Sequence, residues 1–208
     1  MALSQEAAAP VGRRERRKQE VRERILAAAE KLFLRQGFDA TTVDQIADAA
    51  DVAQKTFFNH FPTKQSVFAE FANGRLSVFE ETVRAERARK AATRVRLERT
   101  FAAMAEHVAE MSELARDLTL HMMRAQPPEP AGSEQLSTLQ ATLGGLLEDG
   151  QAQGDVRTDH DLGFLSELVV GAYCMIMIQW AKDPSYPLRE RLSETARFLG
   201  EAIAPARR

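Results

Sequence analysis

Apolar residues in the first third of the chain recur at the spacing of an α-helix. Positions i, i+4, i+7, i+8, i+11 and i+12 lie on one helix face, and they hold Val21, Ile25, Ala28, Ala29, Leu32 and Phe33. Gly37 follows this run and predicts its C-terminal end. No stretch rich in Val, Ile and Thr alternates with the period of a strand. The sequence therefore predicts an all-α fold.

The residues after Gly37 predict two short helices separated by a tight turn. Thr42 with Gln45 fits a capping box, which opens a short helix that Asp51 interrupts. Another short helix is expected over Gln54–His60, because the residue before Pro62 disfavours the α region. A long helix, a short helix, a turn and a short helix form the layout of a helix-turn-helix unit, which many small α domains share.

Helical spacing continues to the end of the chain. Thr63 can cap a fourth helix that continues to about Arg87. Three further apolar faces follow, at Leu97, Phe101, Met104, Val108 and Met111, then Leu136, Leu139, Leu143, Leu146 and Leu147, and finally Leu188, Leu192, Leu199 and Ile203. The longest uncharged apolar run, Leu168–Ile178, has 11 residues, whereas a membrane span needs about 20. With no secretory signal and a single cysteine, Cys174, we expect a cytoplasmic protein with no disulfide framework and no membrane partner.

Charge is unevenly distributed along the chain. The formal net charge of −2 does not suggest a nucleic-acid partner, but residues 1–64 carry 11 basic and 9 acidic side chains. Seven basic and three acidic side chains fall within residues 13–24. This run is either a solvated helix start or an arm that contacts phosphates. A second basic run, residues 84–99, is interpreted as a solvated connection between helices.

At this point the sequence resembles the tetracycline-repressor (TetR) family of bacterial transcriptional regulators. The resemblance is carried by residues 24–29, Leu32-Phe33, Gly37-Phe38, residues 41–43, Ile46-Ala47, Ala50, Val52 and residues 56–64. It implies an all-α homodimer that binds operator DNA. Residues 1–19 would form a basic arm, residues 20–66 a three-helix DNA-binding domain, and residues 67–208 a helical domain for ligand binding and dimerisation.

Three positions depart from the pattern of the family. Asp51 stands where the family usually has Gly, and Asp tolerates positive φ, so the turn can persist. Ala53 stands where Ser often caps the recognition helix, and Asp51 is an open candidate to replace that cap. Phe58 stands where a Tyr hydroxyl often bonds a phosphate, so this contact is not expected here.

The recognition helix would enter the major groove with its N-terminal residues nearest the bases. Gln54 and Lys55 can donate to base edges, and Asn59 is the third candidate. For each of the three, the alternative is an ordinary exposed residue. Phosphate contacts are expected from Thr42, Thr56, His60 and Lys64, and from Arg13, Arg14, Arg16 and Arg17 of the arm.

The helix predicted near residues 162–181 is apolar on two faces and must be buried on both. The resemblance implies that this helix and the last one form the dimer interface through Leu165, Val169, Tyr173, Ile176, Trp180, Leu192 and Leu199. The alternative is a central core helix. An effector pocket, also implied by the resemblance, is expected to involve Phe101, Met104, His107, Met111, His121, Met122, Phe164, Leu168, Gly171 and Met175, although methionines at helical spacing also suit a plain core.

Two other function classes are alternatives to a ligand-responsive regulator. Asp117 with His121, and His107 with Glu110, have helical spacing and could form acid–base pairs. No nucleophile arrangement, phosphate-binding loop or metal pair accompanies them, so we expect no enzyme, no cofactor and no metal site. The second alternative is a DNA-binding dimer whose larger domain binds a protein instead of a small molecule. We expect a repressor that a small apolar or amphipathic molecule releases from its operator, although the sequence alone does not distinguish a repressor from an activator.

Overall fold

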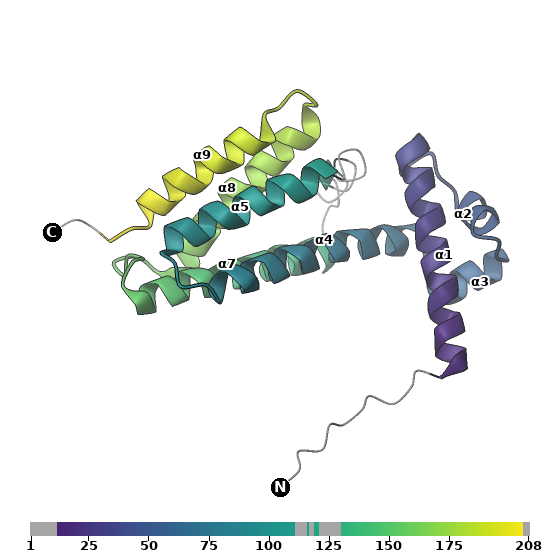
Figure 1. Cartoon of the computed structure of the whole chain (residues 1–208). Helices are drawn as coiled ribbons and strands as arrows, with labels where there is room; N and C mark the ends of the chain where they lie inside the picture. The colour runs from purple at the N-terminus through teal and green to yellow at the C-terminus, as the bar shows by residue number, and fades with distance from the viewer. Residues whose placement is uncertain (1–11, 111–115, 117–118, 121–129, 206–208) are drawn as a thin grey trace, which may run out of the picture. The chain divides into compact units, whose positions relative to one another are not determined.

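Every regular element in the described part of the chain is an α-helix (Figure 1), as the apolar periodicity predicted. The computed structural model describes residues 12–110, 116, 119–120 and 130–205. By its internal contacts the chain divides into two compact units, Met1–Val67 and Phe68–Arg208.

The first unit is built on one long helix, α1 (Arg13–Gln36). Its buried face consists of Ile25, Ala28, Ala29, Leu32 and Phe33, which are residues of the predicted apolar stripe. Gly37 ends the helix at φ 80°, and its N–H donates to the carbonyl oxygen of Phe33 at 2.8 Å. A positive φ of this kind is readily adopted by glycine, which explains why the helix stops there.

Two short helices, α2 (Val43–Ala49) and α3 (Gln54–His60), pack beside α1 (Figure 1). The capping box of α2 is confirmed: Thr42 Oγ1 accepts from the Gln45 N–H at 3.2 Å, and Gln45 Oε1 accepts from the Thr42 N–H at 3.0 Å. Asp51 adopts φ 52° in the turn between α2 and α3, so the turn persists without glycine. Phe57 and Phe61 lie in the core, with ring centroids 6.0 Å apart.

The fourth helix, α4 (Lys64–Arg87), starts where Thr63 predicted it. Thr63 Oγ1 accepts from the Ser66 N–H at 3.1 Å, and Ser66 Oγ accepts from the Thr63 N–H at 3.2 Å. These reciprocal bonds satisfy N–H groups that have no partner inside the helix.

Among its described residues, the second unit combines the larger part of α4 with α5 (Thr93–Glu110), α7 (Pro130–Gln153), α8 (Leu162–Lys182) and α9 (Leu188–Ala202). α5 and α9 run side by side, and α8 packs against both α7 and α9 (Figure 1). Asp161 caps α8 by accepting from the Phe164 N–H at 3.1 Å. The core joins residues from each of these helices, including Phe79, Leu97, Leu146, Val169 and Leu192.

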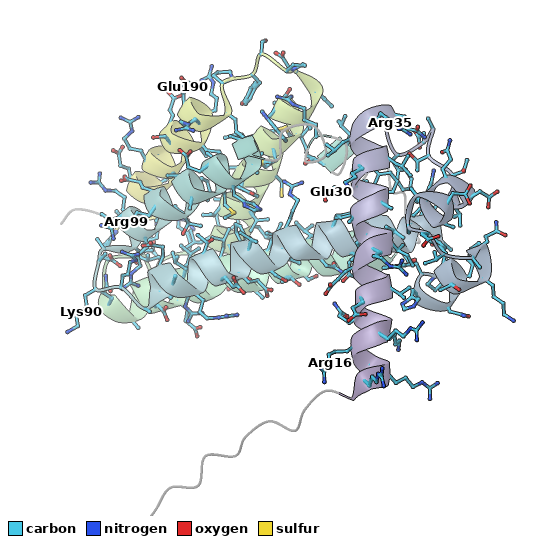
Figure 2. The ribbon with its side chains drawn as sticks, turned by 45° about the vertical axis from the view of Figure 1, so that its right-hand side comes forward. Arg16, Glu30, Arg35, Lys90, Arg99 and Glu190 are labelled. Carbon is cyan, nitrogen blue, oxygen red and sulfur yellow. The ribbon has the colours of Figure 1, made fainter. Side chains whose placement is uncertain are left out.

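Ion pairs and hydrogen bonds join α4, α5 and α7 near the connection between α4 and α5. Arg87 donates to both carboxylate oxygens of Asp149, at 2.6 and 2.9 Å, and this pairing lowers the pKa of Asp149. Arg89 and Arg99 both pair with Glu86, while the side chain of Arg96 is buried and bonds Gln153 at 3.0 Å. The second basic run therefore includes structural ion pairs in addition to the connection itself, where Lys90 lies (Figure 2).

Among the described helices, α8 is long and apolar enough to cross a membrane. One of its faces, which includes Leu165, Val169 and Trp180, is buried in the core of the second unit. Core packing thus accounts for much of its hydrophobicity.

Candidate functional site

The exposed face of α3 carries the three residues expected to contact bases. Gln54, Lys55 and Asn59 are all exposed, whereas Phe57 faces the core with no exposed surface. Phe58 is 46% exposed, and its ring stands edge-on to that of Phe57 with centroids 5.5 Å apart. A buried aromatic anchor therefore fixes the helix while its polar side chains project outward.

The side-chain amide of Gln54 donates a hydrogen bond to the carboxylate of Asp44 on α2. This contact leaves the Gln54 carbonyl oxygen and its second N–H for another partner. Asp44 was not among the predicted site residues. Its place in the first turn of α2 gave no sign of a contact ten positions along the chain.

The N-terminus of α3 has Ala53 as its N-cap and no capping side chain. The open possibility that Asp51 supplies this cap is therefore wrong. The N–H groups of Thr56 and Phe57 both bond the Ala53 carbonyl oxygen, at 2.7 and 3.1 Å.

Lys64 was expected to contact a phosphate, and the structure gives its ammonium group a different role. Nζ donates to the carbonyl oxygens of Phe38 and Thr41, both at 2.7 Å, and lies 3.4 Å from that of Asp39. It also lies 4.2 Å from the centroid of the Phe38 ring. An ammonium group has three donors, and these carbonyls use them. Lys64 therefore joins the start of α4 to the loop between α1 and α2, and the expectation is corrected.

Replacing Lys64 with methionine is expected to destabilise the first unit by about 1–2 kcal/mol, because buried carbonyl oxygens lose a charged donor. Hydrogen exchange of the α2 amides and the thermal midpoint measure the effect. Lys31→Met, at an exposed position of α1, is the control. If Lys64→Met weakened DNA binding while leaving both stability readouts unchanged, the phosphate role would be restored.

His60 lies in the last turn of α3, in a basic environment. Burial lowers its pKa, and the positive charges of Lys18 and Arg22 on α1 lower it further. Arg22 also stacks on the Phe61 ring, with its guanidinium carbon 4.5 Å from the centroid. Positive charge is therefore concentrated where the end of α3 lies near Lys18 and Arg22 of α1, as a phosphate-binding surface would require.

The lowered pKa of His60 predicts a stability loss in mild acid. Below pH 6.5, the ordinary pKa of histidine, the unfolded chain binds a proton that the folded state binds less readily. Stability should therefore fall as the pH drops from about 6.5 through the lower folded pKa. His60→Gln is expected to reduce the difference between thermal midpoints at pH 7.5 and 5.5. His160→Gln, at an exposed histidine, should leave that difference intact, and equal behaviour of the two variants would refute the assignment.

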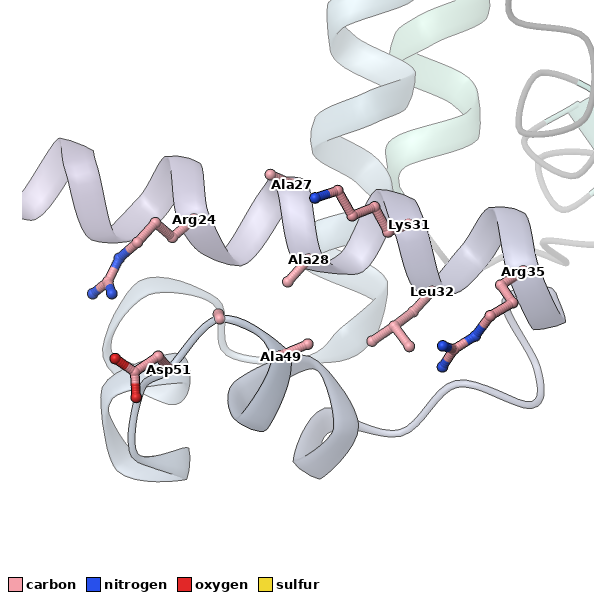
Figure 3. A pocket seen from close by; sticks show the side chains of 9 residues that line it. Arg24, Ala27, Ala28, Lys31, Leu32, Arg35, Ala49 and Asp51 are labelled. Carbon is pink, nitrogen blue, oxygen red and sulfur yellow. The ribbon is translucent and has the colours of Figure 1, made fainter.

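The remaining predicted phosphate contacts lie on exposed or half-buried surface. Arg13, Arg14, Arg16 and Arg17 form the exposed first turns of α1, and Arg16 is labelled there in Figure 2. Thr42 is exposed and Thr56 is half-buried. Further along α1, Arg24, Lys31 and Arg35 line a hollow of about 480 Å³ beside the end of α2 (Figure 3). Basic side chains therefore extend along one helix of the first unit.

The second unit contains a cavity of about 280 Å³ among α4, α5, α7 and α8. Its apolar walls include Leu76, Phe79, Met104, Val108, Leu139 and Met177. Among the described residues, its polar lining includes Arg75, His107, Thr119, Gln135 and the hydroxyl-bearing Tyr173. A mostly apolar cavity with a few polar groups is typical of a small-molecule site.

The cavity contains part of the predicted pocket set, and other described members of that set do not line it. Met104 and His107 line it, while Phe101 is buried behind it with its ring centroid 5.4 Å from that of Tyr173. Phe164, Leu168, Gly171 and Met175 are exposed and do not line it, so their assignment to a pocket is corrected. The positions of Met111, His121 and Met122 lie outside the described residues.

The predicted interface residues are also corrected. Leu165, Val169, Tyr173, Ile176, Trp180, Leu192 and Leu199 are all buried in the core of their own chain. The exposed stripe of α8 is instead formed by Phe164, Leu168, Gly171 and Met175, and α9 adds Phe198, which is 68% exposed. Both faces of α8 are apolar, so periodicity could not say which one faces the core. The alternative prediction, a central core helix, holds for the buried face of α8.

Sequence reasoning also missed Arg75. It lies between Ala72 and Phe79 on α4, and both of these neighbours on the same helix face are buried and apolar. A charged residue at a core-facing position is unusual, and this signal could have identified it from the sequence.

Residues 25–71 match the family described as "Bacterial regulatory proteins, tetR family". TcmR of Streptomyces glaucescens, a helix-turn-helix transcriptional regulator, is 45% identical over 56 residues, which are 27% of this chain and 25% of that protein. The match to this relative therefore spans about a quarter of its length.

Two solved structures are similar over almost the whole chain. FadR of Thermus thermophilus, a TetR-family transcriptional repressor in complex with lauroyl-CoA, is 30% identical, with 90% of this chain and 96% of that chain covered and a TM-score of 0.71. FadR of Bacillus subtilis, in complex with stearoyl-CoA, is 20% identical, with 87% and 98% covered and a TM-score of 0.75. The similarity to the B. subtilis protein shows that the two chains share a fold.

Proposed function

Because this chain belongs to the TetR family of bacterial transcriptional regulators, we propose that it is a homodimeric repressor that a small apolar or amphipathic molecule releases from operator DNA. The observation that carries the proposal is the exposed polar face of α3, which the buried Phe57 anchors to the helix-turn-helix core. The expected location is the cytoplasm, where operator DNA is found.

DNA reading is assigned to Gln54, Lys55 and Asn59. All three are exposed on α3, and the first two belong to its N-terminal turn, which lies nearest the base edges in a helix-turn-helix complex. A lysine donates to guanine O6 and N7, and a glutamine pairs with adenine. The contact with Asp44 limits the rotamers of Gln54 and so reduces the entropy lost on binding.

Contacts with DNA phosphates, which position the protein on the duplex, are assigned to Thr42, Thr56, His60 and the four arginines that open α1. The Thr42 hydroxyl accepts within its own capping box and keeps its O–H to donate to a phosphate oxygen. The arginines contribute charge without sequence preference, so binding should weaken as salt rises.

Dimerisation is assigned to the exposed apolar stripe of α8 together with Phe198 of α9. Phe164, Leu168 and Met175 are 46%, 49% and 54% exposed, which is unusual for large apolar side chains on one helix face. Gly171 lies on the same stripe and has no neighbouring atom around its Cβ position, so a partner helix can approach closely there. A second copy presents the same stripe, as a two-fold interface requires.

Effector binding is assigned to the cavity of the second unit. At about 280 Å³ it lies near the lower end of the roughly 300–1,000 Å³ typical of ligand pockets. The related T. thermophilus repressor was solved with lauroyl-CoA, a molecule with an apolar acyl chain. A coupling of about 1–3 kcal/mol between cavity and DNA would change operator affinity roughly 5- to 150-fold.

The test starts by selecting preferred duplexes from a random DNA pool with the purified full-length protein. Fluorescence anisotropy then compares the selected duplex with random DNA across a salt series, and a panel of apolar and amphipathic compounds is screened for thermal stabilisation and DNA release. Selective binding with release by a compound supports the proposal. Selective binding with no responsive compound favours a protein-binding second domain, and no sequence preference refutes the regulator.

A further inference from the structure

The exposed face of α3 carries a large apolar side chain beside residues assigned to base reading. Phe58 is 46% exposed, and it lies four positions after Gln54 and three after Lys55. Residues at these spacings are neighbours on one side of a helix. α3 therefore presents a phenyl ring next to two polar side chains, on the surface that would face the major groove under the proposed function.

The ring of Phe58 is held against the core of the first unit. It stands edge-on to the ring of Phe57, which has no exposed surface, with an interplanar angle of 90° and centroids 5.5 Å apart. Edge-to-face pairs of this kind are favourable. Phe57 in turn contacts the ring of Phe61, which is also buried. Phe58 is therefore oriented before DNA binds, and little side-chain entropy is lost when its exposed side is covered.

The chemistry of phenylalanine leaves few partners for Phe58 on a DNA duplex. Its side chain carries no hydrogen-bonding group, so phosphate oxygens and polar base edges gain no bond from it. A polar base edge covered by the ring would lose water without compensation. In the major groove, the apolar group that a base edge presents is the 5-methyl group of thymine. This methyl group is the partner that the ring fits.

We propose that Phe58 determines specificity by contacting the 5-methyl group of one thymine in each half-site of the operator. The inference rests on the proposed function, because it adds a residue to the base-reading surface of the same helix. The contact removes apolar surface of both partners from water, whereas another base at that position would present a polar edge to the ring. Phe58 thus selects thymine without a hydrogen bond.

The experiment replaces the thymines of the selected duplex, one symmetric pair at a time, with deoxyuridine, which differs from thymidine only in lacking the methyl group. Fluorescence anisotropy with the full-length protein measures the affinity for each duplex. At one thymine per half-site, the replacement should weaken wild-type binding about fourfold for each half-site and roughly fifteenfold for both, as the burial of one methyl group implies.

The variant Phe58→Ala should bind the thymine and deoxyuridine duplexes equally at that position. Leu34→Ala removes a 44% exposed apolar side chain from α1 in the same unit and should keep the difference. The thermal midpoint and binding to random DNA show whether each variant is folded. If Phe58→Ala does not fold, Phe58→Gln decides the question, because it keeps a long side chain without the apolar ring and should also abolish the preference.

Equal wild-type binding to thymine and deoxyuridine at every position would overturn the inference. A methyl effect that persists in the folded Phe58 variant would also overturn it, and an equal loss of affinity on both duplexes would then make the ring a contact to the sugar–phosphate backbone. In both cases a protein that still selects a DNA sequence leaves the proposed function standing. A protein without sequence preference would refute the proposed function, and this inference with it.

Discussion

Replacing Leu168 with glutamate is expected to make the protein monomeric and to weaken its binding to operator DNA by at least about a hundredfold. Leu168 is 49% exposed, so the substitution leaves the core of the chain intact. In a two-fold interface each copy would place a carboxylate on the apolar stripe of the other, and a desolvated, unpaired charge is costly. The loss of linkage between two DNA-binding units accounts for the fall in affinity.

Analytical ultracentrifugation measures the oligomeric state, and anisotropy measures binding to the selected duplex. Ala102→Glu adds the same charge at an exposed position of α5 and should change neither. The far-ultraviolet spectrum and thermal midpoint of the Leu168 variant show whether its subunit is folded. A folded Leu168→Glu protein that stays dimeric would place the dimer interface on another face.

Replacing Lys55 with alanine is expected to lower affinity for the selected duplex by at least about thirtyfold. A good bidentate contact contributes roughly 1–3 kcal/mol of base discrimination, and a dimer loses the contact in both subunits. Lys55 is exposed at the start of α3, so its removal should leave the fold unchanged. Binding to random DNA should fall much less, since it loses only one charge per subunit.

A matched control separates base reading from general charge. Lys90→Ala removes one exposed lysine from the connection between α4 and α5 (Figure 2) and should leave operator selectivity unchanged. A repeated duplex selection with the Lys55 variant should show relaxed preference at one position of each half-site. Equal losses on selected and random DNA would instead make Lys55 a phosphate contact.

Local chemistry made the helix boundaries of the first unit predictable. The Thr42–Gln45 capping box, the stop at Gly37 and the limits of α3 were all read from neighbouring residues, and the structure confirms them. These features depend on hydrogen bonds and dihedral preferences that act over a few positions. The tolerance of Asp51 for positive φ belongs to the same class and is confirmed.

Predictions about side-chain roles were less reliable where the partner lies far along the chain. The ammonium group of Lys64 bonds carbonyl oxygens of Phe38 and Thr41, more than twenty positions away. No local sequence pattern predicts such a contact, and Lys64, which lies at a helix start, was therefore predicted to contact a DNA phosphate. The bond between Gln54 and Asp44 was missed for the same reason.

The sequence by itself determined the all-α class, the helix-turn-helix layout and the outward-facing residues of α3, because helical period and capping act locally. Only the tertiary structure decided which face of α8 lies inside. Both faces are apolar, and the choice depends on how α7 and α9 pack against that helix. The same packing buries Leu165 and Val169, exposes Phe164 and Leu168, and encloses Arg75 in a cavity. Burial is a property of the assembled helices, and local periodicity cannot encode it when two faces are equally hydrophobic.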